Sequence, residues 1–418
     1  MKERSRIFVW TLFDFANTAF SVIIVTVIYS KYFSNYVAGG QRWLWGLAVS
    51  LSMVVAALLS PPLGAIADVS RNRKRFLLLF TLLSVICTAL LFFIGKGDIL
   101  PGFILFVLAN IGFEGGLVFY DAFLPNLTEK KNYGRVSGYG FAMGYVGALA
   151  VLSIVMILLP AAGSPDYYFY IRLSFVVAAA FFLVFSAPLF LFVSEPHIAE
   201  PLKKDLIKRG INESSNTFKA IFFKRKYPSI SRFLLAFFLY NDAIITIIAF
   251  ASIFASNILR MTDEQIILFF VIVQSTAVLG SFIFGIISDH IGPKKTITIT
   301  LIVWLLVILG AFFVETVVEF YFVGLLAGLS IGSSQSCSRS LMALLTPQER
   351  EAEFFGFYDG LFGKSSAVVG PFVYGVISDI SNERYAALAI GLFFIAGLII
   401  LQKVQVPIFK EGGSKTAL

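Results

Sequence analysis

Long apolar segments, separated by short polar turns, follow one another along almost the whole chain. Each segment has about 20 residues or more, which is the length that an α-helix needs to cross a bilayer. Strands of a membrane barrel would instead show roughly ten-residue stretches of alternating polarity. The pattern therefore predicts an all-α membrane protein with twelve transmembrane helices, at residues 8–33, 43–67, 76–95, 100–124, 136–159, 169–193, 230–256, 265–288, 296–314, 317–345, 354–378 and 385–406.

A polar, basic stretch interrupts this pattern between the sixth and seventh segments. It divides the chain into an N-terminal bundle of six helices at residues 1–194, a linker at 195–228 and a C-terminal bundle at 229–418. Lysine and arginine residues alternate in the linker with leucine, isoleucine and phenylalanine. Such a segment favours either helices on an anionic membrane surface or a solvated connection, and both interpretations stay open at this point.

The composition excludes an ordinary soluble protein. Of the 418 residues, 58% are hydrophobic and 14% are charged, whereas about a quarter of the residues in soluble domains are charged. The two cysteines, Cys87 and Cys337, lie inside apolar segments, so we expect neither a disulfide nor a metal site. No catalytic or phosphate-binding motif lies among the helices, so we expect neither an enzyme nor a cofactor.

Positive charge is distributed unevenly between the two sets of loops. Most of the 33 lysine and arginine residues fall in the loops on one side, which is the cytoplasmic side by the positive-inside rule. We therefore expect a multi-pass protein of the cytoplasmic membrane with both termini in the cytoplasm. The net charge of +8 follows from this topology, and nucleic acid is not an expected partner because no basic and aromatic platform accompanies it.

A short motif recurs at the ends of the second and eighth segments. A glycine is followed four residues later by an aspartate and then by a basic turn, and the two copies are 221 residues apart. An internal repeat of this kind predicts two pseudo-symmetric six-helix bundles. The loop residues that it singles out are Gly64, Asp68 and Arg71 in the first copy and Gly285, Asp289 and Gly292 in the second. We expect the two aspartates to anchor these loops to neighbouring helix ends.

This arrangement resembles the major facilitator superfamily over essentially the whole chain, since the motif is similar to that superfamily's signature loop between helices 2 and 3. The first copy differs at Arg71, which stands where the usual pattern has glycine, whereas the second copy keeps Gly292. Residues 10–20 and 353–371 are similar to the vacuole-effluxer branch, which is named after a fungal vacuolar amino-acid exporter. The resemblance implies a major facilitator fold and a secondary active transporter.

The same resemblance implies that small metabolites, amino acids first, leave the cytoplasm by alternating access, with proton coupling as an open possibility. An exporter of lipophilic or amphipathic compounds is the alternative. We expect a monomer whose partners are a small-molecule substrate and membrane lipid.

Seven ionisable residues lie inside the predicted spans, where a charge is costly unless it faces water or a partner. These are Asp14, Glu114, Asp121, Asp242, Arg339, Asp359 and Lys364. On the first, fourth, seventh and tenth spans, polar residues share a helix face with them. In the family that the chain resembles, these four helices line a central cavity. The side chains expected to bind substrate or couple its transport are Asp14, Asn17, Asn110, Glu114, Asn241, Asp242, Gln335 and Lys364.

A gate is expected closer to the cytoplasm than the middle of the spans, formed by Asp121, Arg339 and Asp359. The internal repeat places Asp121 opposite Arg339, and an ion pair present in only one state would bias alternating access. Asp14 lies at a similar depth. It is expected either to serve the cavity or to keep a fixed hydrogen bond within its own half.

The eleventh span carries two charges that an α-helix would keep apart. Asp359 and Lys364 are five residues apart, which is about 140° around an α-helix, so we expect them on opposite faces, unable to face the cavity equally, with Lys364 ranked above Asp359 for binding substrate. Lys364 would then hold the carboxylate of a zwitterion, and Glu114 or Asp242 its ammonium group. Either acid, once removed from water, is a candidate for taking up a proton during the cycle.

Overall fold

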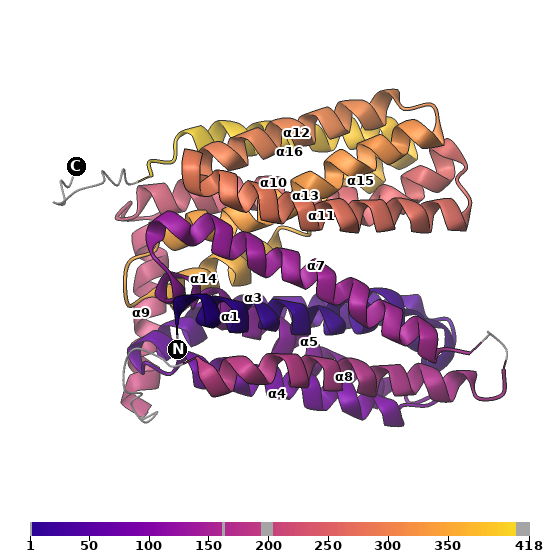
Figure 1. Cartoon of the computed structure of the whole chain (residues 1–418), viewed down its shortest axis with the longest axis horizontal. Helices are drawn as coiled ribbons and strands as arrows, with labels where there is room; N and C mark the ends of the chain where they lie inside the picture. Colours follow the sequence, from indigo (N-terminus) through magenta and orange to yellow (C-terminus); the bar gives the residue numbers. More distant parts are fainter. Residues whose placement is uncertain (1, 161–163, 194–203, 407–418) are drawn as a thin grey trace.

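The computed structural model describes residues 2–160, 164–193 and 204–406, and these residues form two bundles of helices stacked on each other (Figure 1). The first bundle comprises α1 (Glu3–Ala19), η1 (Phe20–Val27), α2 (Tyr29–Lys31), η2 (Tyr32–Val37), α3 (Arg42–Val69), α4 (Arg73–Leu90), η3 (Leu91–Phe93), α5 (Ile99–Asp121), α6 (Leu124–Leu127), η4 (Lys130–Asn132), α7 (Tyr133–Leu158) and α8 (Tyr167–Phe192). The second comprises α10 (Pro228–Leu259), α11 (Asp263–Ile291), α12 (Pro293–Phe313), α13 (Val317–Leu345), α14 (Glu351–Phe355), η5 (Gly356–Gly363), α15 (Val369–Ile380) and α16 (Glu383–Gln402).

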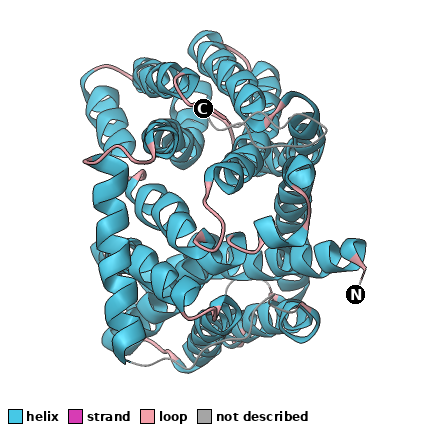
Figure 2. Ribbon diagram, turned by 90° about the vertical axis from the view of Figure 1, so that its left-hand side faces the viewer, coloured by secondary structure: helices cyan, strands magenta, loops and turns pink. Residues whose placement is uncertain are grey.

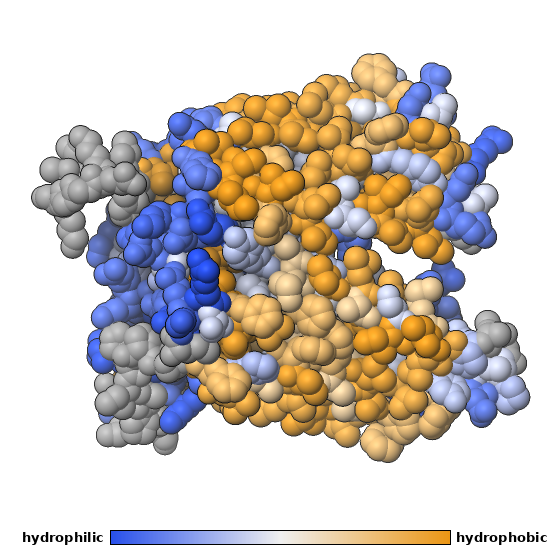
Figure 3. All heavy atoms as spheres, viewed as in Figure 1, coloured by the Kyte–Doolittle hydropathy of each residue, from blue (hydrophilic) through white to orange (hydrophobic). Residues whose placement is uncertain are grey.

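Eleven helices in the described part of the chain are long and apolar enough to cross a membrane. Together with an interrupted span they confirm the predicted twelve-helix fold. Figure 3 shows the apolar band that these helices present between two polar ends, as expected for a surface that faces lipid. The start of α1, the end of α16 and the linker helix lie at one polar end (Figure 1), which we call the terminal side.

The eleventh predicted span, 354–378, is broken instead of continuous. It consists of α14, the π-helical segment η5 and, after a short turn, α15. Pro371 lies in the first turn of α15, and its ring would clash with the carbonyl group of Ala367 in a continuous helix. The chain therefore leaves the helix before Val369 and starts a new one there.

The first span also departs from a regular α-helix. Predicted at 8–33, it runs from Glu3 to Val37, and two π-helical segments, η1 and η2, occupy much of its second half. Segments of this kind are infrequent and are often found at functional sites.

The linker contains an amphipathic helix, α9 (Lys204–Phe222). It runs across the terminal side, transverse to the spans, from the first bundle to the second (Figure 1). Figure 2 looks onto the terminal side and shows α9 as the long upright helix along one edge of the molecule. Of the predicted linker, residues 195–203 lie outside the described part of the chain.

Candidate functional site

A cavity of about 580 Å³ lies between the two bundles, within the usual size range of small-molecule sites. Its wall contains acids from both halves and bases from the second, together with aromatic and aliphatic side chains. Figure 3 shows the surface hollowed between the bundles at the end opposite the terminal side. On the terminal side, ion pairs and helix contacts join the bundles. The structure is therefore closed toward the termini.

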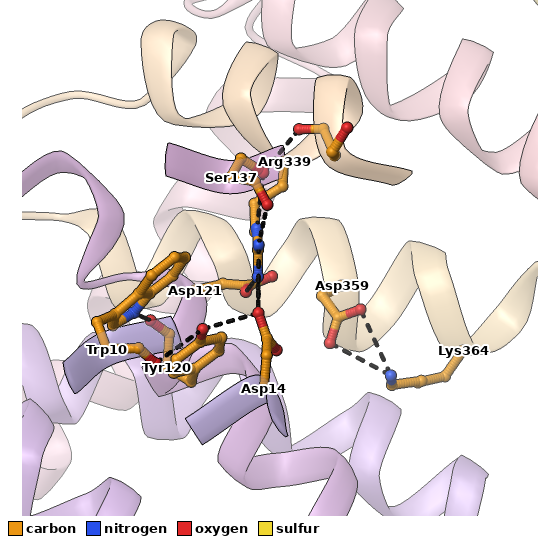
Figure 4. Close-up of polar contacts among 9 residues, drawn as sticks. Trp10, Asp14, Tyr120, Asp121, Ser137, Arg339, Asp359 and Lys364 are labelled. Carbon is orange, nitrogen blue, oxygen red and sulfur yellow. Dashed lines mark hydrogen bonds and ion pairs between the residues drawn. The ribbon is translucent and has the colours of Figure 1, made fainter. Parts of the chain in front are cut away.

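Arg339 of α13 forms the closed end of the cavity. The residue is 1% exposed, and its guanidinium group is 2.9 Å from Asp121 of α5 and 3.3 Å from Asp14 of α1. It also donates hydrogen bonds to the hydroxyl group and the carbonyl group of Ser137 at 2.9 and 2.8 Å. One cation of the second bundle thus holds three helices of the first (Figure 4). The ion pair expected between Asp121 and Arg339 is present, and its gating role stays a prediction.

Aromatic rings surround this ion pair and were not anticipated from the sequence. The guanidinium carbon of Arg339 lies 4.2 Å from the ring centre of Phe141 and 4.9 Å from that of Trp10, within cation–π range. The Tyr120 hydroxyl donates to Asp14 at 2.8 Å. The only sequence signal was position, because Trp10 lies one helical turn before Asp14 and Tyr120 is adjacent to Asp121.

Lys364 is the centre of a second charged cluster. Its ammonium group forms ion pairs with Glu114 of α5 and, at 3.2 Å, with Asp359 of η5. The expectation that Asp359 and Lys364 lie on opposite faces is therefore wrong. In a π-helix the hydrogen bond closes from residue i to i+5, so side chains five apart come to lie over each other. Figure 4 shows both residues converging from the same stretch of chain.

Each cluster contains two carboxylates for one cation. Arg339 serves Asp14 and Asp121, and Lys364 serves Glu114 and Asp359. Unbalanced charge is expensive away from water, so a proton on one carboxylate, or a bound cation, would bring either cluster to neutrality.

Three of the expected cavity residues are absent from the cavity wall. Asp242 is fully buried and accepts hydrogen bonds from the Gly370 amide at 3.0 and 2.8 Å, where it caps the start of α15. Asn110 donates to Ser52 at 2.8 Å, inside the first bundle. Asn17 is 4% exposed. The break before α15, which the hydrophobic pattern did not show, therefore engages Asp242 away from the cavity.

Asn241 and Gln335 do line the cavity. Asn241 donates to the hydroxyl group of Ser366 at 2.6 Å, next to the break in the eleventh span. Gln335 accepts from the Tyr145 hydroxyl at 3.1 Å, across the bundle interface. The side-chain amides of Asn241 and Gln335 thus make the wall of the second bundle polar at these two positions.

The signature aspartates reach across the interface between the bundles. Asp68, at the end of α3, accepts from the amides of Ala352 and Glu353 at 3.2 and 2.8 Å and from Arg73 at 2.6 Å. Arg73 in turn forms an ion pair with Glu351. We call these residues the first clamp. The expected anchoring to helix ends is present, but the helix belongs to the opposite bundle.

Asp289 forms the second clamp. It makes the equivalent contacts from the second bundle to the first. It accepts from the amides of Gly134 and Arg135 at 2.8 and 3.3 Å, and from the Arg135 side chain at 2.5 Å. A Cβ atom on Gly285 would lie 2.8 Å from the carbonyl oxygen of Gly134, and one on Gly64 would lie 2.2 Å from that of Ala352. Glycine therefore lets the helices touch at both clamps.

The turn after each aspartate has a left-handed residue at the same repeat position. Arg71 has a φ of 54° and Gly292 a φ of 89°. The first turn thus keeps a positive φ at this position even though arginine replaces the glycine of the usual pattern.

Comparisons with known proteins agree with this geometry. A family model described as "Vacuole effluxer Atg22 like" matches residues 45–408. The chain belongs to this family. It is 31% identical over 405 residues to an uncharacterised major-facilitator-type transporter, YxiO, of Bacillus subtilis, with 94% of this chain and 93% of the relative covered. It is 25% identical to autophagy-related protein 22 of Coccidioides immitis, with 84% and 70% covered.

Solved structures show the same fold. The fucose:proton symporter FucP of Escherichia coli aligns with a TM-score of 0.74 at 15% identity, covering 97% of this chain and 98% of that one. The proton:xylose symporter XylE aligns with a TM-score of 0.75 at 13% identity, covering 97% and 96%. The chain is thus a multi-pass membrane transporter of the major facilitator superfamily, in its Atg22-like branch, and it has a transporter fold, not that of an enzyme.

Proposed function

We propose that this Atg22-like transporter exports small zwitterionic metabolites, amino acids first, from the cytoplasm by alternating access. The observation that carries the proposal is a cavity, closed on the terminal side, in which Lys364 lies between Glu114 of one bundle and Asp359 of its own. A zwitterion needs both charges at one place. In this proposal the protein is a monomer in the cytoplasmic membrane, and the terminal side faces the cytoplasm.

Exchange of ion pairs is the step by which the cluster would bind substrate. The substrate carboxylate would replace one acid on Lys364, and the released acid, Glu114, would accept the substrate ammonium group. Each new contact replaces one that already exists, so neither protein charge is left unpaired in a medium where that is costly. Because Glu114 and Lys364 come from opposite bundles, a substrate bound to both would couple its own binding to the approach of the two bundles.

Proton coupling follows from the excess of acids. When the substrate carboxylate replaces Glu114, it shares Lys364 with Asp359, and a proton on Asp359 would remove the excess negative charge around that lysine. The Arg339 cluster would act as the gate: separation of the bundles at the terminal side breaks the contacts of Arg339 with Asp14 and Asp121, and return to the closed state restores them.

Export of lipophilic or amphipathic compounds is the second candidate, and the aliphatic part of the cavity wall favours it. Met53, Val54 and Leu117 of the first bundle face Ile244 and Ile245 of the second in the lining. Such a wall would bind an apolar body, while the two charged clusters would bind at most its polar end.

Transport by the purified protein in proteoliposomes tests both candidates. We expect labelled amino acids to move in the wild type, and a pH gradient to change the rate. Lys364→Gln should reduce the rate about tenfold or more, because a hydrogen bond to a charged group contributes about 1.5–3 kcal/mol. Lys96→Gln, which removes an exposed lysine from a loop, is the matched control. Movement of a lipophilic cation without any amino acid would reject the proposal and favour the second candidate.

A further inference from the structure

The helix α9 joins the two bundles on the terminal side through its buried face. Gly210 lies against α3, where a Cβ atom would come within 2.9 Å of the Ile66 backbone. Seven residues later, Thr217 accepts a hydrogen bond from Arg350 of the second bundle. Phe222 stacks on Phe362 of η5 with ring centres 5.5 Å apart. The helix therefore contacts both halves at once in the closed state.

The apolar surface of α9 extends beyond these protein contacts. At about 100° per residue, the buried residues Gly210, Ser214, Thr217 and Ile221 fall within one arc of roughly 60°. Beside this arc, Ile207, Ile211 and Phe218 form a second stripe roughly 40° wide, and these three side chains are 40%, 50% and 39% exposed. Phe218 also lies near Phe357 of η5, with ring centres 6.3 Å apart, and all three side chains keep a substantial exposed surface.

Exposed lysines border the apolar stripe on the side away from the protein. Lys208 and Lys219 lie roughly 60–80° beyond its far edge, and neither has an ion pair within the described residues. The helix lies transverse to the spans at the edge of the molecule (Figures 1 and 2). An apolar stripe flanked by lysines, on a helix in this orientation, has the pattern of a helix that rests in a membrane interface.

We propose that α9 is a membrane-surface element: Ile207, Ile211 and Phe218 enter the boundary of the bilayer and Lys208 and Lys219 bind anionic lipid headgroups. Because the neighbouring, buried face of α9 joins the two bundles in the closed state, anionic lipid that holds α9 in place would stabilise that state. The ligand is a lipid surface. It can shift the equilibrium between the open and closed states only because α9 contacts it differently in the two states.

Spin labels on the two faces of α9 test its position in the full chain. In a background with Cys87 and Cys337 replaced by serine, labels at Ile211→Cys and Asn216→Cys are compared in phosphatidylcholine vesicles containing phosphatidylglycerol. We expect oxygen, which concentrates in lipid, to relax the label at 211, and a water-soluble nickel chelate to relax the label at 216. Equal access of the chelate to both labels would show a solvated helix and overturn the proposal.

Headgroup charge is tested by comparing vesicles with and without phosphatidylglycerol. Each lysine near an anionic surface contributes about fivefold to an equilibrium that depends on its contact with that surface. In vesicles with phosphatidylglycerol, Lys208→Gln with Lys219→Gln should therefore lower the ratio of the closed to the open state of the terminal side by up to roughly 25-fold. The matched control, Lys130→Gln with Lys131→Gln, removes the same charge from η4 on the same side. Equal responses of the two pairs, or no response to phosphatidylglycerol, would overturn headgroup binding. Both readouts are independent of which substrate is transported.

Discussion

The two clamps on the terminal side use the same geometry but differ in their surroundings. In both, an aspartate at a helix end accepts backbone amides from the opposite bundle and pairs with an arginine. The arginine of the first clamp, Arg73, is 12% exposed and has a second acid, Glu351. The arginine of the second, Arg135, is 39% exposed and has Asp289 alone among the described acids.

The difference between the clamps comes from what surrounds each of them. Arg209 and Glu213 of α9 line a polar cavity of about 370 Å³ together with the first clamp. The α9 side chain Thr217 contacts Arg350, which pairs with Glu353 at 2.6 Å. A repeated motif thus produces one clamp that the linker reinforces and one whose arginine is more exposed. We expect the first to contribute more to the closed state.

Removing the charge of the aspartate in either clamp should give the largest change in the stability of the closed state. Asp68→Asn should destabilise the closed state by about 3 kcal/mol, because Arg73 loses one of its two acids and two amides of the opposite bundle lose a charged acceptor. Asp289→Asn should cost about 1 kcal/mol, since Arg135 can recover hydration. Distances between spin labels at Arg75 and Lys403, both exposed and one on each bundle, measure the opening. Equal effects of the two changes would contradict the ranking of the clamps.

A methyl group at the paired glycines tests helix contact at the same two places. The Cβ atom of Gly64→Ala would come closer to the facing backbone than that of Gly285→Ala, at 2.2 against 2.8 Å. Since overpacking costs about 1–3 kcal/mol, we expect about 2 kcal/mol at Gly64 and about 1 kcal/mol at Gly285. The same label pair reports the change. A larger opening with Gly285→Ala would show that the second clamp controls closure.

Loss of the α9 hydroxyl group should weaken only the first clamp. Thr217→Val removes one of the acceptors of Arg350, which keeps Glu353, and one hydrogen bond contributes about 1 kcal/mol. Ser215→Ala, at an exposed position of the same helix, is the control. In an Asp68→Asn background the effect of Thr217→Val should shrink, because the two changes act on one network. If the effects of Thr217→Val and Asp68→Asn were fully additive, the contact of α9 would be independent of the first clamp.

The smallest expected effect has the opposite sign. Arg71→Gly should stabilise the first turn by up to about 1 kcal/mol, because a left-handed conformation is strained for residues other than glycine. Gly292→Arg should destabilise the second turn by a similar amount. Thermal unfolding of the two variants in detergent measures both changes. A melting temperature lowered by Arg71→Gly would mean that the Arg71 side chain contributes more than its backbone conformation costs.

Much of the charged architecture could be predicted from spacing alone. The repeat paired Asp121 with Arg339 because equivalent helices of two pseudo-symmetric bundles face each other across one axis. The partners Trp10, Tyr120 and Ser137 could not be predicted, since aromatic and serine residues occur throughout the spans and no periodicity separates these from the rest.

For the two charged residues of the eleventh span, the sequence predicted their location in the membrane but not the directions in which their side chains point. A regular α-helix would separate Asp359 from Lys364, and the π-helical turn brings them together. Pro371 signals a break, yet it does not show that Asp242 would cap the helix that follows. Both outcomes depend on backbone hydrogen bonds that hydrophobic periodicity does not specify.

The sequence by itself determined the membrane class, the spans and the twofold repeat, because the thickness of a bilayer and the cost of charge within it act on each segment separately. Only the tertiary structure decided which charges share a partner and that Asp68 and Asp289 hold the opposite bundle instead of their own. These contacts join residues far apart in the chain, and they depend on how closely the helices approach at their glycines.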